Sequence, residues 1–335
     1  MEKILEVNDL HVTFTTYGGT VKAVRGVNFY LNKGETLAIV GESGCGKSVT
    51  SNAIMRLIPD PPGKISRGTI TFKGKQLTDV TEKEMRSIRG VDISMIFQDP
   101  MTALNPTLTI GTQLMEGLRE HHKTSSAEAK EKAIEMMELV GIPNPEERFK
   151  QYPHQFSGGM RQRIVIAIAL ICEPELLIAD EPTTALDVTI QAQILELFDR
   201  IQTQTGVSII LITHDLGVVA KIADRIAVMY AGKIIESGTR REIFYHAEHP
   251  YTKGLLQSVP RLDMKGEKLI PIDGTPPDLF SPPQGCPFTA RCPMAMEVCN
   301  KVYPVETEVS DTHKVDCWLQ DDRAKQLLAE TADQT

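Results

Sequence analysis

The chain has 335 residues, of which 41% are apolar and 24% are charged, a composition typical of a folded protein and not of a disordered one. Its longest uninterrupted apolar run, Ile164–Cys172, has nine residues, about half of the ~20 that a membrane-spanning helix needs, so we expect no transmembrane segment. Acidic residues outnumber basic ones, 44 to 36, and no Lys/Arg block stands out, which argues against a protein that wraps nucleic acid.

The first residues, Met1–Glu6, mix charges and show no long apolar segment before a small-residue cleavage site. No export signal is therefore expected, and the chain is placed in the cytoplasm. Because cytosolic thiols are kept reduced, the six cysteines are not expected to form a disulfide framework.

Two kinds of β-strand are expected. Segments that alternate apolar and polar residues between glycine-containing turns predict an antiparallel β layer. These segments are Leu5–Phe14, Val21–Leu31 and Gly68–Phe72. Short, nearly continuous apolar runs predict the buried strands of a largely parallel sheet, so the fold class is α/β. These runs are Thr36–Val40, Ile93–Phe97, Leu176–Ala179 and Ser208–Ile212.

From about Met101 to Tyr152 the pattern is helical. Ser125 and Glu128 have the spacing of a capping box, and apolar residues such as Met137 follow at helical intervals. We therefore expect a helical subdomain over about residues 101–172.

The segment Gly41–Ser48, GESGCGKS, follows a predicted strand and precedes a helix-compatible run, which is the context of a phosphate-binding loop and disfavours a chance glycine turn. Its glycines let backbone N–H groups face phosphates, and the helix N-terminus adds positive potential. We expect Lys47 to reach the β- and γ-phosphates of ATP and Ser48 to bind Mg²⁺. The predicted ATP-binding residues here are Gly41, Ser43, Gly44, Cys45, Gly46, Lys47, Ser48 and Val49.

The apolar strand that begins at Leu176 ends in two carboxylates, which lie where α/β proteins bind ligands. Asp180 suits a Mg²⁺ shell, and Glu181, expected on the opposite side of the pleat, is predicted to polarise the water that attacks the γ-phosphate. The alternative is that one of them caps the turn at Pro182; the phosphate-binding loop favours the catalytic interpretation.

The segment Phe156–Gln162, FSGGMRQ, resembles the signature motif of ABC ATPases. Ser157 can cap a helix that begins here, while Gly158 and Gly159 expose backbone N–H groups, which makes a second anion site; an ordinary capped helix start is the alternative. In that family the signature of one subunit closes over ATP held by another, so the resemblance implies a head-to-tail dimer.

The resemblance also implies roles for four single residues. Gln98 matches the Q-loop residue that senses Mg²⁺ and the attacking water, and His214 matches the switch histidine. Asp187, in Ala185-Leu186-Asp187, matches the D-loop residue that communicates across the dimer. Tyr17, 30 residues before Lys47, matches the aromatic residue that stacks on adenine, with Phe14 as its competitor.

Composition changes near His249, since ten of the 20 prolines and four of the six cysteines lie beyond residue 248. Four thiolates in one short segment predict a [4Fe–4S] cluster or a Zn²⁺ site; the alternative is that they only pack a small extension. Gaps of five, six and seventeen residues lack the paired two-residue gaps of a zinc ribbon and favour the cluster. These cysteines are Cys286, Cys292, Cys299 and Cys317.

The tail resembles the C-terminal extension of the ATPases of oligopeptide and dipeptide importers, and within them the D-type subunits. The resemblance rests on HPYTKGLL from His249, on Gly285-Cys286-Pro287 and on Arg291-Cys292-Pro293, together with the loop QDPMTALNP from Gln98. It implies an ABC cassette over residues 1–250 and a Cys/Pro-rich extension over 251–335.

The implied partners are a second, non-identical ABC ATPase, two membrane permease subunits and an extracytoplasmic peptide-binding receptor, and the implied place is the cytoplasmic face of the membrane. Nickel or heme importers are related alternatives. A soluble ABC ATPase that acts on nucleic acid or ribosomes is disfavoured, because such chains usually carry two cassettes or a long coiled-coil insertion, and this sequence shows neither.

Overall fold

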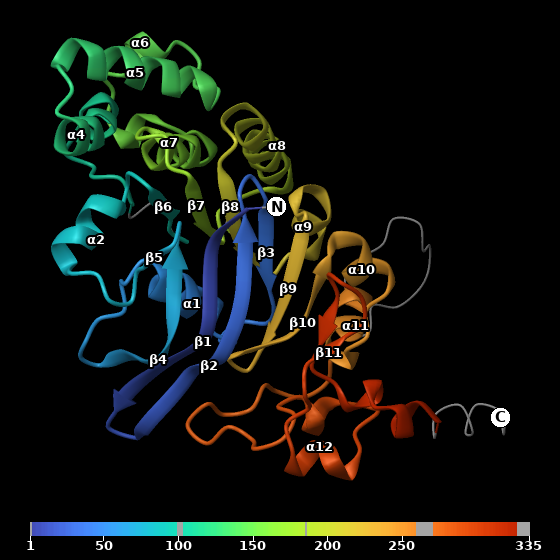
Figure 1. The fold of residues 1–335 in the computed structure, drawn as a ribbon. Coiled ribbons are helices and arrows are strands. Elements are labelled where there is room, and N and C mark those ends of the chain that lie inside the picture. Colours follow the sequence, from blue (N-terminus) through green and yellow to red (C-terminus); the bar gives the residue numbers. More distant parts are fainter. Residues whose placement is uncertain (1, 99–102, 185, 259–270, 327–335) are drawn as a thin grey trace. The chain divides into compact units, whose positions relative to one another are not determined.

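The computed structural model describes residues 2–98, 103–184, 186–258 and 271–326. The chain forms two compact units, each built from several stretches of sequence. Unit 1 consists of residues 1–5, 31–36 and 71–213, and unit 2 consists of residues 6–30, 37–70 and 214–335. Figure 1 shows the ribbon with its elements labelled.

Unit 1 contains three parallel strands in the order β8-β7-β6. Their bounds are Ile93–Ile96 for β6, Leu176–Asp180 for β7 and Ser208–Thr213 for β8. Every residue of β7 and β8 is buried, as expected for strands covered on both faces. The three apolar runs of the sequence are therefore confirmed as strands.

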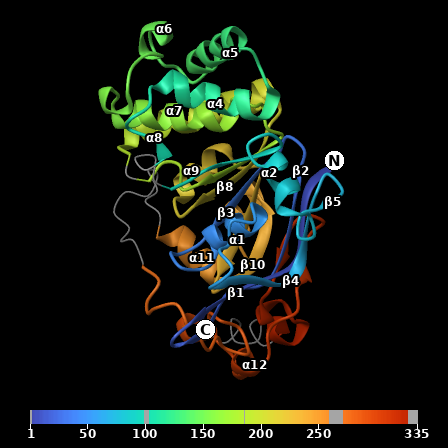
Figure 2. The same ribbon diagram turned by 90° about the vertical axis from the view of Figure 1, so that its left-hand side faces the viewer.

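The helices of unit 1 include those of the helical subdomain that the sequence predicts over about residues 101–172. Their bounds are α2 Glu82–Ile88, α4 Ile110–His122, α5 Ser126–Leu139, α6 Pro145–Arg148, α7 Gly158–Leu170 and α8 Val188–Thr205. The 3-10 turn η1 spans Pro153–Gln155, and the short strand β5 spans Lys75–Gln76. Figures 1 and 2 both place α4, α5 and α7 side by side.

The sequence expectation for the start of α5 is met in part. Ser125 caps α5 by accepting the N–H of Glu128 at 3.3 Å, although only this half of the capping box is formed. Cys172 is buried against Leu118, Ala129 and Ile171, so it is a core residue of the helical group. The nine-residue apolar run lies largely within α7, which is buried on most of its surface.

Among the described residues, unit 2 holds five sheet strands and most of the β layer. The sheet strands run in the order β11-β12-β10-β9-β3, with β3 and β9 parallel and the rest antiparallel. Their bounds are β3 Thr36–Val40, β9 Arg225–Tyr230, β10 Lys233–Thr239, β11 Thr307–Glu308 and β12 Lys314–Val315. The layer strands β1 Lys3–Thr16, β2 Gly19–Asn32 and β4 Gly63–Phe72 lie in the order β2-β1-β4.

The helices of unit 2 are short. Their bounds are α1 Lys47–Ile54, α9 Leu216–Ile222, α10 Arg240–Tyr245, α11 Pro250–Gln257 and α12 Glu297–Lys301, with 3-10 turns η2 at Thr289–Arg291 and η3 at Trp318–Gln320. In the part of the chain that the structure describes, no helix is long and apolar enough to span a membrane.

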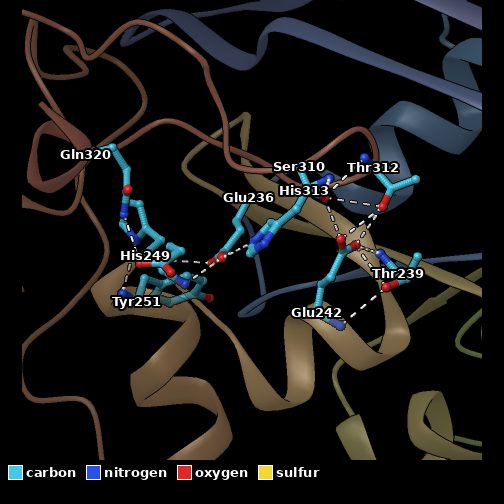
Figure 3. Close-up of polar contacts among 10 residues, drawn as sticks. Glu236, Thr239, Glu242, His249, Tyr251, Ser310, Thr312, His313 and Gln320 are labelled. Atoms are coloured by element: carbon cyan, nitrogen blue, oxygen red, sulfur yellow. Dashed lines mark hydrogen bonds and ion pairs between the residues drawn. The ribbon is translucent and has the colours of Figure 1, made fainter.

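The Cys-rich segment is joined to the sheet of unit 2 by strand pairing and by a buried polar network (Figure 3). Glu236 of β10 accepts a hydrogen bond from His313 at 2.8 Å and two more from the N–H groups of Glu248 and His249. Glu242 accepts hydrogen bonds from the hydroxyl of Thr239, at the end of β10, and from those of Ser310 and Thr312 in the Cys-rich segment. Burial alone raises the pKa of Glu242, but these hydrogen bonds bring that pKa down to about 2.

Candidate functional site: a phosphate-binding loop and a carboxylate edge

The predicted phosphate-binding loop joins β3 to α1. Gly41, Gly44 and Gly46 have φ angles of 153°, 77° and 104°, in the left-handed region that favours glycine. A Cβ atom on Gly41 would lie 2.1 Å from the carbonyl oxygen of Met229, so no larger residue fits there. The loop therefore packs closely against β9, and α1 begins directly after it at Lys47.

Lys47 is buried over this loop. Its Nζ donates to the carbonyl oxygens of Gly41 at 2.8 Å and Glu42 at 3.0 Å. An ammonium group held at this position, beside a helix N-terminus, suits the binding of phosphate oxygens. Cys45 is a small, buried loop residue, and burial raises the pKa of its thiol.

Tyr17 lies at the turn between β1 and β2, and its side chain is fully exposed. Phe14, the competing aromatic residue, is half-buried and packs against Gly63: a Cβ atom on Gly63 would lie 2.7 Å from the Phe14 ring. Of the two rings, Tyr17 is the one fully presented to solvent, where an adenine base could stack on it.

The carboxylate edge lies in unit 1. Asp180 is the last residue of β7 and is buried, whereas Glu181 follows it with a left-handed φ of 48°. Gln98, which follows β6, donates from Nε2 to Glu181 Oε2 at 2.9 Å, and the hydroxyl of Thr184 donates to the same oxygen at 3.0 Å. The structure therefore brings two predicted catalytic residues, Gln98 and Glu181, into direct contact.

The orientation of Glu181 has a different cause from the one expected from the sequence. Strand alternation does not orient Glu181, because the residue lies beyond the end of β7; the left-handed turn does. The N–H of Glu181 donates to the carbonyl of Ile212 at 2.9 Å, which fixes that turn to the neighbouring strand β8. Neither Thr184 nor this backbone bond was expected from the sequence.

The signature segment begins helix α7. Ser157 caps it by accepting the N–H of Met160 at 3.4 Å, as predicted. A Cβ atom on Gly159 would lie 2.8 Å from the Ile190 side chain, whereas one on Gly158 would meet nothing within 4 Å. Gly159 is therefore required for packing on α8, and Gly158 leaves an open, exposed backbone at the helix start.

Gln162, which the sequence analysis did not single out as a site residue, connects this helix to the carboxylate edge. Its buried Nε2 donates to the carbonyl of Pro182 at 2.6 Å, one residue beyond Glu181. The sequence signal for Gln162 was its position in the signature motif, five residues after Ser157. A shift of α7 would therefore be transmitted to the turn that holds Glu181.

Two further predicted residues lie at strand and helix ends. His214 is exposed and directly follows β8. Asp187 caps α8 by accepting the N–H groups of Thr189 and Ile190. Residues 99–102 of the predicted extended Q-loop and Ala185 of the predicted D-loop lie outside the described residues.

The four tail cysteines line one cavity in unit 2. The cavity is lined by Cys286, Cys292, Cys299 and Cys317, with His249, Phe288 and Trp318 among its other walls. Burial and the nearby thiols raise the pKa of Cys286 to about 11 and that of Cys317 to about 12. Among the described residues, no three His, Cys, Asp or Glu side chains converge closely enough to hold a single metal ion.

The cysteine-lined segment also contacts the phosphate-binding loop, which the sequence did not predict. Arg291 forms a two-pronged ion pair with Glu42, with N–O distances of 2.7 and 2.8 Å. The phenol oxygen of Tyr251 accepts the backbone N–H of Glu42 at 2.9 Å. Arg291 and Tyr251, each more than 200 positions from Glu42 in the sequence, thus hold this second residue of the loop.

Two regions of the chain match models of known protein families. Residues 24–184 match the model described as ABC transporter, and residues 235–299 match the one described as oligopeptide/dipeptide transporter, C-terminal region. The chain is 70% identical to the dipeptide transport ATP-binding protein DppD of Bacillus subtilis, covering 98% of both chains. It is 62% identical to the oligopeptide transport ATP-binding protein OppD of the same species, covering 95% of this chain and 89% of that one.

Solved structures show the same fold. The chain matches the dimeric post-hydrolysis structure of the ATP-binding cassette MJ0796 bound to ADP and Pi with a TM-score of 0.63 and 27% identity, covering 71% of this chain and 99% of that one. It matches cbiO1 of Clostridium perfringens, part of the ABC transporter complex cbiONQ, with a TM-score of 0.63 and 30% identity over 73% of this chain and 92% of that one.

Proposed function

The chain belongs to the ATP-binding subunits of ABC transporters, in the branch with an oligopeptide/dipeptide-transporter C-terminal region, and from this premise we propose that it drives peptide import by hydrolysing ATP. The family resemblance inferred from the signature and the tail is thereby confirmed. The observation that carries the proposal is the combination, in one chain, of a formed phosphate-binding loop and a Gln98–Glu181 pair at a strand edge.

Each predicted site residue has a chemical task in this proposal. Lys47 and the loop N–H groups would bind the phosphates, Ser48, Asp180 and Gln98 would hold Mg²⁺, and Tyr17 would stack on the adenine. Glu181 accepts a proton from the attacking water, which Gln98 helps to orient, and His214 holds the γ-phosphate. Mg²⁺ neutralises the charge on the phosphate oxygens when bound.

The signature of this chain serves a second subunit. The helix start at Ser157 and Gly158 is exposed, with open space beside Gly158, and the MJ0796 cassette is dimeric in the matched structure. We infer a head-to-tail dimer with a second, non-identical ABC ATPase, docked on two permease subunits at the cytoplasmic face of the membrane. A peptide-binding receptor on the other side delivers the substrate.

We propose that the tail cysteines hold a [4Fe–4S] cluster and not Zn²⁺. All four thiols line one cavity, which is the donor set such a cluster needs. Their sequence gaps of five, six and seventeen residues lack the paired two-residue gaps of a zinc ribbon.

The cluster proposal predicts a colour. We expect protein purified without oxygen to be brown, to absorb near ~400 nm and to contain iron and sulfide, as thiolate-bound clusters do. Cys299→Ser should remove the absorbance, whereas Cys172→Ser, in the helical core of unit 1, should leave it unchanged. A colourless protein with one zinc per chain would contradict the proposal.

The transport proposal predicts a response to substrate. We expect the ATPase rate of the importer, reconstituted with its permeases, its second ATPase and its receptor, to rise when the receptor is loaded with a dipeptide. Receptor loaded with a free amino acid is the matched control and should produce no rise. Equal rates for all receptor states, across di- to pentapeptides, would contradict a role in peptide import.

A further inference from the structure

We propose that Arg291 couples the cysteine-lined cavity to the phosphate-binding loop, so that ATP binding and the state of that cavity influence each other. The inference rests on the proposed role of this loop in binding ATP. Every residue that carries it belongs to unit 2, so the contacts lie within one compact unit.

Arg291 anchors the phosphate-binding loop through Glu42. Arg291 can donate five hydrogen bonds, and five are formed. The acceptors are both carboxylate oxygens of Glu42, the phenol oxygen of Tyr230 at 3.1 Å, and the carbonyl oxygens of Ile272 at 3.1 Å and Asp273 at 2.9 Å. The Arg291 side chain is only 5% exposed, whereas that of Glu42 is 26% exposed. A guanidinium group whose donors are all used, and whose charge is buried, holds its partner firmly.

Aromatic rings pack around this ion pair. Tyr251, which accepts the N–H of Glu42, packs on Tyr230 with ring centroids 4.5 Å apart. Phe288 packs against both tyrosines at 5.4 Å, and Arg291 lies 5.8 Å from the centroids of the Tyr230 and Phe288 rings. The loop residue Glu42 is thus held by two contacts at once, one to its backbone and one to its side chain.

The residues on either side of the turn Thr289–Arg291 line the cysteine-lined cavity. Phe288 lines it, and Cys292, the residue after Arg291, lines it as well. Cys286 and Cys299 are tied together by a backbone hydrogen bond of 2.8 Å, and the hydroxyl of Thr289 donates to the carbonyls of both. A rearrangement of the thiols therefore moves the turn Thr289–Arg291, and this turn carries the guanidinium group that holds Glu42.

Coupling of this kind is reciprocal: if the cavity changes the affinity for ATP, then ATP changes the cavity by the same factor. The chain contains one tryptophan, Trp318, and it lines the cavity beside Cys317. Its indole N–H donates to the carbonyl of Val302 at 2.9 Å. The fluorescence of Trp318 therefore reports on the cavity without any added label.

The test is an ATP titration of the full chain, with Mg²⁺, followed by Trp318 fluorescence and in parallel by equilibrium dialysis. We expect a saturable fluorescence change in the natural protein, with the Kd that dialysis gives. Arg291→Met keeps the apolar stem but removes the guanidinium group; we expect it to abolish the fluorescence change and to raise the Kd about fivefold or more. Arg323→Met is the control, because Arg323 is exposed and pairs only locally with Asp321.

Glu42→Gln provides a second variant that removes the same ion pair from its more exposed end, in case Arg291→Met fails to fold. We expect it to lose the fluorescence response as well. Tight ATP binding by dialysis with no Trp318 response in the natural protein would overturn the coupling and leave the ATPase role intact. So would a normal response in both Glu42→Gln and Arg291→Met. Absence of ATP binding in the natural protein would instead count against the proposed function.

Discussion

Glu181→Gln is expected to lower the ATP hydrolysis rate of the assembled importer by at least about 100-fold while ATP binding is retained, because a positioned general base contributes about 10²–10⁴-fold. The amide has the size of the carboxylate but cannot take a proton from water. Its oxygen can still accept the hydrogen bonds that Gln98 and Thr184 donate, so the turn should keep its shape. The measurement is phosphate release at saturating ATP, with nucleotide binding determined in parallel.

The matched control is Glu175→Gln. Glu175 immediately precedes β7, so it lies at the opposite end of the same strand, where it pairs with Lys73. We expect this change to leave the hydrolysis rate within about twofold of the natural protein, since the ion pair is largely exposed and weak. An unchanged rate in Glu181→Gln would remove Glu181 from the catalytic role.

His313→Ala is expected to destabilise the protein by about 3–5 kcal/mol, because it removes one partner of a buried ion pair and leaves the other charge buried. The side chains of Glu236 and His313 are 0% and 2% exposed (Figure 3). The free energy of unfolding by urea measures the effect. Lys314→Ala, in the same hairpin, removes only surface ion pairs with Glu306 and Glu308 and should cost about 1 kcal/mol or less.

The destabilisation should depend on pH. The hydrogen bond to Glu236 raises the pKa of His313 above 6.5, so its contribution is complete below pH 6.5 and is lost as the pH rises through the raised value. For Glu236, burial raises the pKa, but the bonds from His313 and the backbone outweigh it and leave the pKa below 4.5. Its contribution is therefore present above pH 4.5 and is lost in stronger acid. His313→Ala should cost more at pH 6 than at pH 9; equal costs would show that no charge pairing is involved.

The local parts of the fold were predictable from the sequence. A phosphate-binding loop needs only a strand, glycines at left-handed positions and a helix start, and all three are encoded between Thr36 and Ile54. The same holds for Ser157, since an N-cap is a contact within four residues. Short-range rules therefore located the loop residues and Ser157, whereas Gln98, His214, Asp187 and Tyr17 were assigned through the family resemblance.

The long-range parts could not be predicted in this way. The pairing of β12 with β10 joins residues almost 80 positions apart, and the Arg291–Glu42 ion pair joins residues 249 positions apart. Neither leaves a periodic pattern, because each depends on how distant segments pack. Arg291 was quoted beside Cys292 as part of a family motif, yet only the structure assigns it a partner.

Peptide uptake is the most direct test of the proposed role in ATP-driven peptide import. It is measured in proteoliposomes that contain this chain, its second ATPase and both permeases, with the receptor present. We predict that labelled dipeptide accumulates only with ATP and Mg²⁺, and that the Glu181→Gln chain abolishes accumulation while the Glu175→Gln chain does not. Accumulation that proceeds equally with Glu181→Gln, or that never occurs for any di- to pentapeptide despite ATP hydrolysis, would contradict it.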